Sequence, residues 1–334
     1  PSGVRMRYNG MGRGACLEQW LTRSYPCVLD VTLISRPIDS HEEDRGREEP
    51  AGWLTLLVSS TQRWKTASLN TSPWSSALHD HVTPLLRLAP ASFPNLEALD
   101  LRVGKLVTQP PILNAPNLRR LTLWAWNDEW DTPVSFILLS DLSFKGRGID
   151  LRQTLNLVRL CPNIINCRFA DIKGENFDTP SPDARPITLT QLQSLSITLA
   201  PRTVSPPAPV FDVPGLRDLT IEFWNWQGDV DTDEYGVTTN TLFYIERFGA
   251  QLTSATLQYC VFEEAAMLQI LEGLSRVEHL SVCAMATALS CAVFAGLSLS
   301  QGIDGKTGAR GTAVLCPNLR SMELRVVCVE PKDY

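Results

Sequence analysis

A short pattern of apolar residues, L-x-x-L-x-L, returns along the whole chain and constrains its fold more than any other feature. The clearest copies follow a proline-asparagine-leucine step, as in FPNLEALDL at 93–101, APNLRRLTL at 115–123 and CPNLRSMEL at 316–324. A self-similar unit that recurs every ~20 to 50 residues is the signature of a repeat protein. The pattern therefore predicts a stack of similar units.

Nine copies of the pattern can be aligned on their first apolar residue. They begin at Leu96, Leu118, Leu139, Ile164, Leu192, Leu216, Leu252, Val277 and Leu319, so the intervals are 22, 21, 25, 28, 24, 36, 25 and 42 residues. Most of these intervals lie in or near the range of leucine-rich repeats, and we interpret the long ones as insertions. A weaker tenth copy, Trp64/Ala67/Leu69, precedes them.

The spacing within each copy predicts a short β-strand. The last two apolar residues of a copy are two positions apart, so they point to the same side of a strand while their neighbours point outward. One such strand cannot bury its apolar side alone, but stacked strands form a continuous core. Helix-like segments at 151–160, 241–248 and 263–274 lie between the copies. We therefore expect an α/β, leucine-rich-repeat-like solenoid, with a curved parallel sheet and with helices and irregular loops on its convex side.

The boundaries of this solenoid follow from where the pattern stops. We expect residues 1–19 to be a disordered or irregular segment and residues 20–334 to form a single irregular solenoid. The chain begins without an initiator methionine, and we expect it to be part of a longer product. Regular leucine-rich repeats carry Asn or Cys three residues after the last strand position; only Cys260 fits here, and Trp126 and Trp224 occupy two of these positions. We therefore expect irregular turns.

The outward strand positions are the candidate functional residues. They are nearly all polar, and the concave face of a solenoid is its usual binding surface. For any single residue, a solvated exterior with no binding role is an equally good interpretation. The candidate protein-binding residues are Arg102, Arg120, Trp124, Lys145, Arg168, Asp218, Glu222, Gln258, His279, Glu323 and Arg325.

Charge and cysteine usage restrict the class of partner and the compartment. The net charge of -6 argues against nucleic acid, since phosphate binding needs a basic surface. Nine cysteines without a Cys-x-x-Cys pair favour reduced thiols in a cytoplasmic or nuclear protein. The uncharged run 283–300 is rich in alanine, serine and threonine, so we interpret it as a buried helix and expect no membrane partner.

The sequence contains no convincing catalytic, metal or cofactor motif. DGKTG at 304–308 resembles the end of a phosphate-binding loop, but Ser300 stands where that motif needs glycine. The glycine cluster at 10–15 has no strand before it, and the pair His79 and His81 has no further ligand at suitable spacing. We therefore predict a non-enzymatic protein without a metal or another cofactor.

Several of these segments together resemble one protein family. EQWLTRSYPCVLDVTL at 18–33 resembles the WLxRSxxxPLxLxL segment of fungal, basidiomycete F-box proteins with leucine-rich-repeat-like C-terminal regions. The similarity covers most of the chain from about Trp20 onward. It continues through SSTQRWKTASL at 59–69, the three proline-asparagine-leucine copies, LVRLCPNI at 157–164, LTQLQSLSI at 189–197 and VPGLRDLTI at 213–221.

The resemblance implies a substrate receptor of a Skp–cullin–F-box ubiquitin ligase. In such proteins the F-box contacts the Skp adaptor, and the repeat region captures the protein to be ubiquitylated. The F-box should precede Trp20, and residues 1–19 do not contain it, so a Skp partner is expected only if an F-box lies upstream. The alternatives are a stand-alone repeat scaffold with no ligase link and, as a weaker reading, an unrecognised enzyme. The protein substrate is not identified by any residue.

Overall fold

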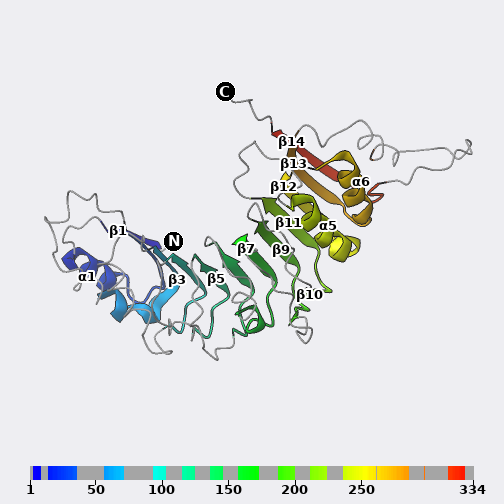
Figure 1. Cartoon of the computed structure of the whole chain (residues 1–334). Helices are drawn as coiled ribbons and strands as arrows, with labels where there is room; N and C mark the ends of the chain where they lie inside the picture. Colours follow the sequence, from blue (N-terminus) through cyan, green and yellow to red (C-terminus); the bar gives the residue numbers. More distant parts are fainter. Residues whose placement is uncertain are drawn as a thin grey trace, which may run out of the picture. The chain divides into compact units, whose positions relative to one another are not determined.

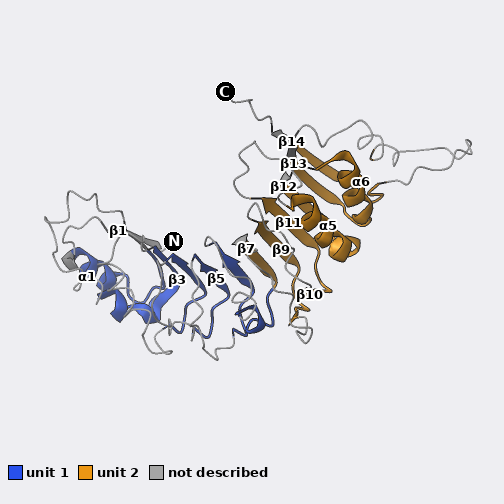
Figure 2. Cartoon of the chain, in the orientation of Figure 1, with its two compact units in different colours: residues 1–164 blue, residues 165–334 orange. Residues whose placement is uncertain are grey.

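The chain divides into two compact units, Pro1–Ile164 and Ile165–Tyr334 (Figure 2). The expectation of one continuous unit over 20–334 stays a prediction. The computed structural model describes residues 3–8, 14–35, 56–70, 93–102, 115–124, 136–145, 157–172, 187–199, 211–223, 236–260, 262–285, 297 and 315–327.

The first unit is built on a parallel sheet whose strands follow one another in chain order (Figure 1). Each strand pairs in parallel with the next because the connecting chain returns to the same edge before every strand. The strands are β1 (Gly3–Tyr8), β2 (Leu29–Ser35), β3 (Trp64–Asn70), β4 (Ala98–Arg102), β5 (Arg120–Leu123) and β6 (Asp141–Phe144).

Residues 1–19, which we expected to be irregular, contain β1 and the first part of helix α1 (Gly14–Arg23). GVRMRY alternates apolar and polar residues, a pattern typical of a strand. In α1, Leu17 and Leu21 are one helical turn apart and both are buried, so this helix has a packed side. Regular structure therefore begins well before the first copy of the repeat.

The side chain of Arg63 links the C-terminal end of α1 to the start of β3 by hydrogen bonds. It lies in a short 3₁₀ turn (Thr61–Arg63) just before β3, and its guanidinium donates to the carbonyl oxygens of Leu21, Ser24 and Cys27 at 3.0, 2.7 and 2.9 Å. It also donates to Ser24 Oγ at 2.9 Å. The last carbonyls of a helix have no partner within the helix, and here a side chain 36 to 42 residues away supplies donors to that end of the chain.

The second unit contains a parallel sheet of the same kind and a small two-stranded parallel sheet. Helices α5 (Val237–Phe248) and α6 (Glu264–Gly273) lie on one face of its larger sheet (Figure 1). The larger sheet has the order β7 (Asn166–Ile172), β9 (Ser194–Leu199), β11 (Asp218–Phe223), β12 (Ser254–Cys260), β13 (His279–Met285) and β14 (Ser321–Val327). The small sheet pairs β8 (Ile187–Thr188) with β10 (Phe211–Asp212).

Two of the three expected helices are confirmed, since α5 contains the segment 241–248 and α6 lies within the segment 263–274. Of the segment 151–160 only residues 157–160 are described, and 157–159 are helical. The α5 and α6 backbones approach closely near their C-terminal ends. A Cβ added to Gly249 would lie 2.5 Å from the carbonyl oxygen of Gly273, so a larger residue at Gly249 would force the two helix ends apart.

The core lies where the repeat predicts it. Leu99, Leu121 and Leu142 are partners in the register of β4, β5 and β6, and all three are buried. In the second unit the same holds across β9, β11, β12 and β13, where Leu195, Leu219, Ala255 and Leu280 form one buried row and Ile197, Ile221, Leu257 and Val282 form the other. An α/β fold with parallel sheets of inward-facing repeat residues is therefore confirmed.

Two places depart from this alternation. Leu319, Met322 and Leu324, in the last copy, are only half-buried, because β14 has a single neighbour among the described strands of the sheet. Thr198 occupies an outward strand position on β9, yet it is only 3% exposed. Its burial is explained by the charged residues that lie beside it, described below.

The same hydrogen-bonded turn precedes nine of the described strands, namely β4 to β7, β9 and β11 to β14. The amide of the first apolar residue of each copy donates to the carbonyl three residues earlier, as from Leu118 to Ala115 at 3.1 Å. In eight of these copies the next amide donates to a carbonyl of the preceding repeat; before β5, the adjacent amides of Arg119 and Arg120 share the carbonyl of Glu97 at 2.8 and 3.0 Å. The strand spacing is therefore fixed by backbone bonds made at the turn.

Asparagine side chains reinforce these turns in a series that we call the asparagine ladder. Each asparagine stands one position before the first apolar residue of its copy and donates its amide to a turn carbonyl of the copy before. The bonds are Asn95 to Gln62 at 2.7 Å, Asn117 to Pro94 at 2.6 Å, Asn163 to Ile137 at 2.9 Å and Asn318 to Ser275 at 3.0 Å. The turns that precede the strands are thus regular. The positions where we expected irregular turns follow the strands, and Trp126 and Trp224 lie outside the described residues.

Candidate functional site

All eleven predicted binding residues are accessible to solvent. Each lies at or just beyond the end of a strand or at an outward strand position, and each is half-buried or exposed. We call the side of each sheet that carries these residues its polar face. The first unit holds Arg102, Arg120, Trp124 and Lys145, and the second holds Arg168, Asp218, Glu222, Gln258, His279, Glu323 and Arg325.

The structure brings three of the four residues of the first unit together around the indole of Trp124. The Arg102 guanidinium carbon lies 3.3 Å from the centre of the indole ring, and Lys145 Nζ lies 5.5 Å from it. The indole Nε1 donates a hydrogen bond of 3.0 Å to Asp100 Oδ1, which orients the ring. We call Asp100, Arg102, Trp124 and Lys145 the tryptophan cluster.

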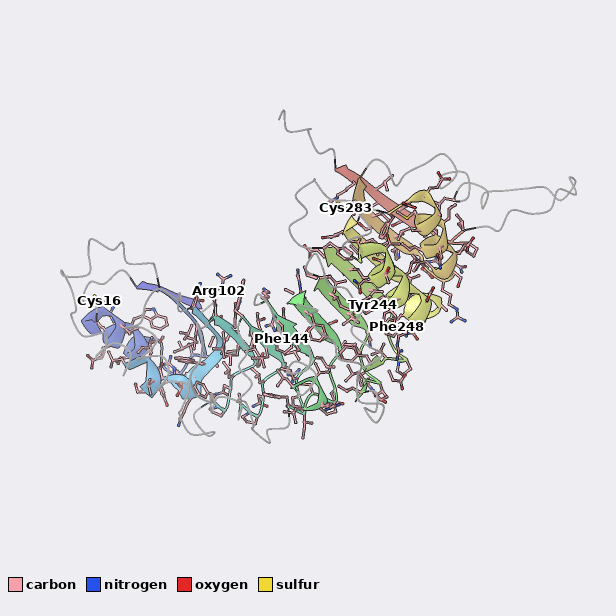
Figure 3. The ribbon with its side chains drawn as sticks, in the orientation of Figure 1. Cys16, Arg102, Phe144, Tyr244, Phe248 and Cys283 are labelled. Carbon is pink, nitrogen blue, oxygen red and sulfur yellow. The ribbon has the colours of Figure 1, made fainter. Side chains whose placement is uncertain are left out.

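The tryptophan cluster follows from the register of three neighbouring strands. Arg102 ends β4, Trp124 comes directly after β5 and Lys145 directly after β6, and the amide of each later residue bonds to the strand before it. Figure 3 shows Arg102 pointing away from the ribbon. Arg120 stands apart from the cluster, because it lies four residues before Trp124, about 13 Å along an extended strand.

In the second unit Arg168 and Glu222 form an ion pair that spans one strand. Arg168 Nη2 lies 3.7 Å from Glu222 Oε2, although β9 runs between their strands β7 and β11. Thr198 on β9 donates to the same carboxylate oxygen at 3.2 Å and is covered by the pair. The sequence analysis missed Thr198, and its signal would have been the register that places it beside Glu222.

The remaining predicted residues of the second unit lie along β11 to β14. Arg325 contacts Glu323 on the same strand at 2.7 Å, and Ser281 donates to Glu323 at 3.4 Å. His279 Nδ1 lies 3.3 Å from Ser321 Oγ. Asp218 is in register with Ser194 and Ser254, and Gln258 with Glu222 and Cys283. Short hydroxyl side chains therefore separate the charged residues of this face.

Among the residues that the structure describes, burial shifts the pKa of three ionisable side chains, and all three belong to the core. Burial raises the pKa of the Cys161 thiol to about 12 and that of Cys316 to about 11. Burial also raises the pKa of Tyr244, which lies on α5 with Phe248 (Figure 3). Each group is thus held in its neutral form at physiological pH, where a thiol is a poor nucleophile.

The sequence also raised a metal site, a membrane-spanning helix and a phosphate-binding loop as possibilities. Among the residues that the structure describes, no three His, Cys, Asp or Glu side chains are gathered as a metal site. No helix in the described parts is long and apolar enough to cross a membrane. His79, His81 and the segment 304–308 lie outside the described residues, as does most of 283–300.

Comparison of the sequence with models of protein families gives no match, and a search of curated proteins gives no significant match.

Proposed function

We propose that the chain is a non-catalytic protein-binding module with the architecture of an irregular leucine-rich-repeat-like solenoid. The observation that carries this proposal is the polar face, on which neighbouring parallel strands present charged, aromatic and hydroxyl side chains in register. Repeat proteins use such extended faces to bind other proteins. The concentration of arginine and tryptophan at one place on it is typical of binding hot spots.

The resemblance to F-box proteins makes a substrate receptor of a ubiquitin ligase the specific form of this proposal. One contact supports treating the resembling segments as parts of one structure. Arg63, from the second quoted segment, binds the carbonyls of Leu21, Ser24 and Cys27 in the first. These two segments therefore contact each other in the fold, which supports treating them as one motif.

The binding proposal is tested by comparing two matched triple variants in affinity purification. The first reverses charges on the polar faces with Arg120→Glu, Asp218→Lys and Arg325→Glu. The second changes the net charge equally at exposed positions away from the sheet strands, with Arg23→Glu, Glu272→Lys and Arg276→Glu. We expect the first variant to lose a partner that wild type and the second variant retain, and the affinity of the purified pair then gives the size of the loss. Loss of the partner from the second variant alone would refute the polar face as the binding surface.

The ligase link needs a separate experiment on the full-length gene product. We expect a Skp-type adaptor and a cullin to co-purify with it from its native cell, independently of the polar-face charges. If neither associates while the partner of the polar face is still captured, the chain is a repeat scaffold without a ligase role.

A further inference from the structure

We propose that an exposed apolar strip on the turns of the first unit binds a short amphipathic helix of another protein, one that carries acidic residues beside its apolar side. The strip, which we call the turn strip, consists of Pro94, Pro116, Ile137, Leu138 and Pro162. It lies at the turns that precede the strands, so it is a different surface from the polar face. The inference goes beyond the proposed function, because the turn strip does not need the polar face in order to bind.

The turn strip follows from the regular turns of the first unit. In four successive copies the residue two positions before the first apolar residue of the copy is itself apolar, namely Pro94, Pro116, Ile137 and Pro162. The ladder bonds from Asn117 to Pro94 at 2.6 Å and from Asn163 to Ile137 at 2.9 Å connect successive turns. Because adjacent strands are ~4.8 Å apart, the four turns extend over about 14 Å.

Ile137 and Leu138 depart from the sequence of the other turns in this unit. The other three copies have proline followed by asparagine at these two positions. Leucine cannot make the ladder bond, and Leu138 gains little from burial because it is 48% exposed; Ile137 is 57% exposed. A local choice that costs stability without a gain inside the fold marks a functional position.

The exposed apolar residues of the turn strip are contiguous. Single apolar residues are common on protein surfaces, whereas contiguous ones mark interaction sites. Ile137 and Leu138 are neighbours in the chain, and the exposed Pro116 and Pro162 belong to the turns before and after them. Proline has a fixed φ, so these turns lose little conformational entropy when a partner binds.

The spacing of the turns favours a helix as the occupant. A helix presents one residue of its apolar side per turn, every ~5.4 Å, which is close to the ~4.8 Å between the turns of the strip. In an extended segment the residues on one side are ~6.7 Å apart, which matches the strip less well. The carbonyls of Pro94 and Ile137 already accept ladder bonds, and a helix satisfies its own backbone groups. A helix of about 10 residues has the length of the strip.

The charged residues beside the turn strip favour an acidic partner. The carbonyl of Arg119 accepts from the amide of Ser140, two residues after Leu138, at 2.9 Å, so the exposed Arg119 belongs to the border of the strip. The ranges 93–98, 115–120, 136–141 and 157–164 contain three positive and two negative residues, Arg119, Arg120, Arg159, Glu97 and Asp141. Glu97 is paired with Lys65 at 3.6 Å, which leaves a positive surplus on a chain whose total charge is -6.

This surplus also argues against a second copy of the chain as the occupant. A two-fold contact between two turn strips would bring the same positive charges together, and like charges across an interface oppose binding. A different protein with acidic residues beside its apolar stripe has the complementary charge. Because the charges are exposed, added salt should weaken the interaction.

The test uses the purified full chain and an array of fourteen-residue, helix-forming peptides. Each peptide has apolar residues every three or four positions and glutamates beside them. Each is paired with a copy in which lysines replace the glutamates and with a copy in which the apolar residues are distributed around the helix. The strongest acidic peptide is labelled with fluorescein and titrated by anisotropy against wild type, Ile137→Gln, Leu138→Asn and Arg119→Glu.

Two variants outside the turn strip are the matched controls. Val28→Thr changes an apolar residue of the same unit that is 45% exposed. Arg23→Glu reverses the charge of an exposed arginine on α1.

We expect the acidic peptide to bind, and its lysine copy and its redistributed copy to bind at least about tenfold more weakly. Ile137→Gln and Leu138→Asn should each weaken binding about fivefold, because each removes apolar area from the contact. Arg119→Glu should weaken the acidic peptide and strengthen its lysine copy, and both controls should bind as wild type does. Leu138→Asn restores the ladder residue, so a thermal melt should show a fold at least as stable as wild type, and its loss of binding then cannot come from unfolding.

The proposal is overturned if no acidic peptide binds, if either copy binds equally, or if Ile137→Gln and Leu138→Asn are both without effect. Sedimentation velocity tests the other occupant. A wild-type dimer that Leu138→Asn converts to a monomer would assign the turn strip to a second copy of the chain and would overturn the helix proposal.

Failure of this inference is separable from failure of the proposed function. If the Arg120, Asp218 and Arg325 reversals abolish partner capture while no acidic peptide binds the wild-type chain, the polar-face function stands and the turn strip is refuted. If those reversals leave capture intact while Leu138→Asn weakens peptide binding, the turn strip stands and the polar-face function is refuted.

Discussion

The side-chain amide of Asn117 donates a hydrogen bond of 2.6 Å to the backbone carbonyl of Pro94, one repeat earlier in the chain. The proline-asparagine-leucine motifs of the sequence therefore have a structural role. The leucine closes the turn through its amide, and the asparagine ties that turn to the one before. Asparagine side chains thus connect successive turns in this protein, but at a position before each strand, whereas regular leucine-rich repeats carry the asparagine after the strand.

The asparagine ladder predicts the effect of two opposite substitutions. Asn117→Ala should lower the free energy of unfolding by about 1 kcal/mol through loss of one hydrogen bond. Leu138 holds the equivalent position one repeat later and is 48% exposed, so Leu138→Asn should raise stability by donating to the carbonyl of Pro116. Urea denaturation of both variants measures the changes, and a neutral Asn117→Ala would show that the bond carries no net stability.

Gly215 stands at the same position in another repeat, and its lack of a side chain has a steric reason. A Cβ there would lie 2.9 Å from the carbonyl oxygen of Thr190 and 3.3 Å from that of Leu192. Both contacts are with backbone, which cannot swing away. Gly215→Ala should therefore destabilise the protein by about 1–3 kcal/mol, the usual range for an overpacked site. The exposed Thr190→Ala is a control of similar size, and an unchanged melting temperature for Gly215→Ala would contradict the steric account.

The bonds from Arg63 predict a local effect on α1. Arg63→Gln removes most of the donors that hold the end of this helix, and we expect a loss of about 2–3 kcal/mol for hydrogen bonds to a charged group. Hydrogen exchange should accelerate for amides of α1 and remain unchanged in β9 to β12. The nearby exposed Lys65→Gln is the control, since its ion pair with Glu97 has a distance of 3.6 Å and the two side chains are 47% and 44% exposed, where such pairs add little stability.

The repeat core predicts a difference between the middle and the end of a sheet. Leu121→Ala, in the fully buried row of β5, should cost ~2–5 kcal/mol as a large-to-small truncation. Leu324→Ala, on β14, should cost less than half of that, because the side chain is already partly in water. Denaturant midpoints distinguish the two, and equal losses would mean that β14 is as well covered as β5.

The buried thiols predict a pattern of chemical reactivity and a pH dependence. At pH 8, iodoacetamide should modify the exposed Cys16 and Cys27 and leave Cys161 and Cys316 as protonated, inaccessible thiols, as mass spectrometry of the peptides would reveal. The folded-state pKa of Cys161 is raised from 9.0 to about 12, so its stabilising contribution is complete below pH 9 and is lost as the pH rises toward 12. Rapid alkylation of Cys161 in the folded protein would contradict its burial.

The repeat residues show why much of the fold was predictable. Leu121 and Leu123 repeat with period two beside a turn motif, and burial on one side of a strand requires that period. The parallel direction of the strands also follows, because similar copies joined by long connections must return to the same edge. Local sequence does not show which described strand has a single neighbour in the sheet, and so the partial exposure of Met322 was not predicted.

The candidate site was predictable in its positions and not in its contacts. Alternation alone placed Arg102, Trp124 and Lys145 on the outward side. It did not place the indole beside Asp100, because that contact depends on rotamers and on register with another strand. Thr198 was missed for the same reason, since its burial comes from the Arg168 and Glu222 side chains that meet above it.

The turn before each strand also determines how this chain tolerates change in length. Neighbouring strands are spaced by bonds made within the few residues around each turn, and these bonds have the same form although the copies are separated by 21 to 42 residues. Evolution can therefore lengthen, shorten or replace a connection without redesigning the sheet, and a protein engineer can place a tag or a reporter domain in one of the long connections on the same ground.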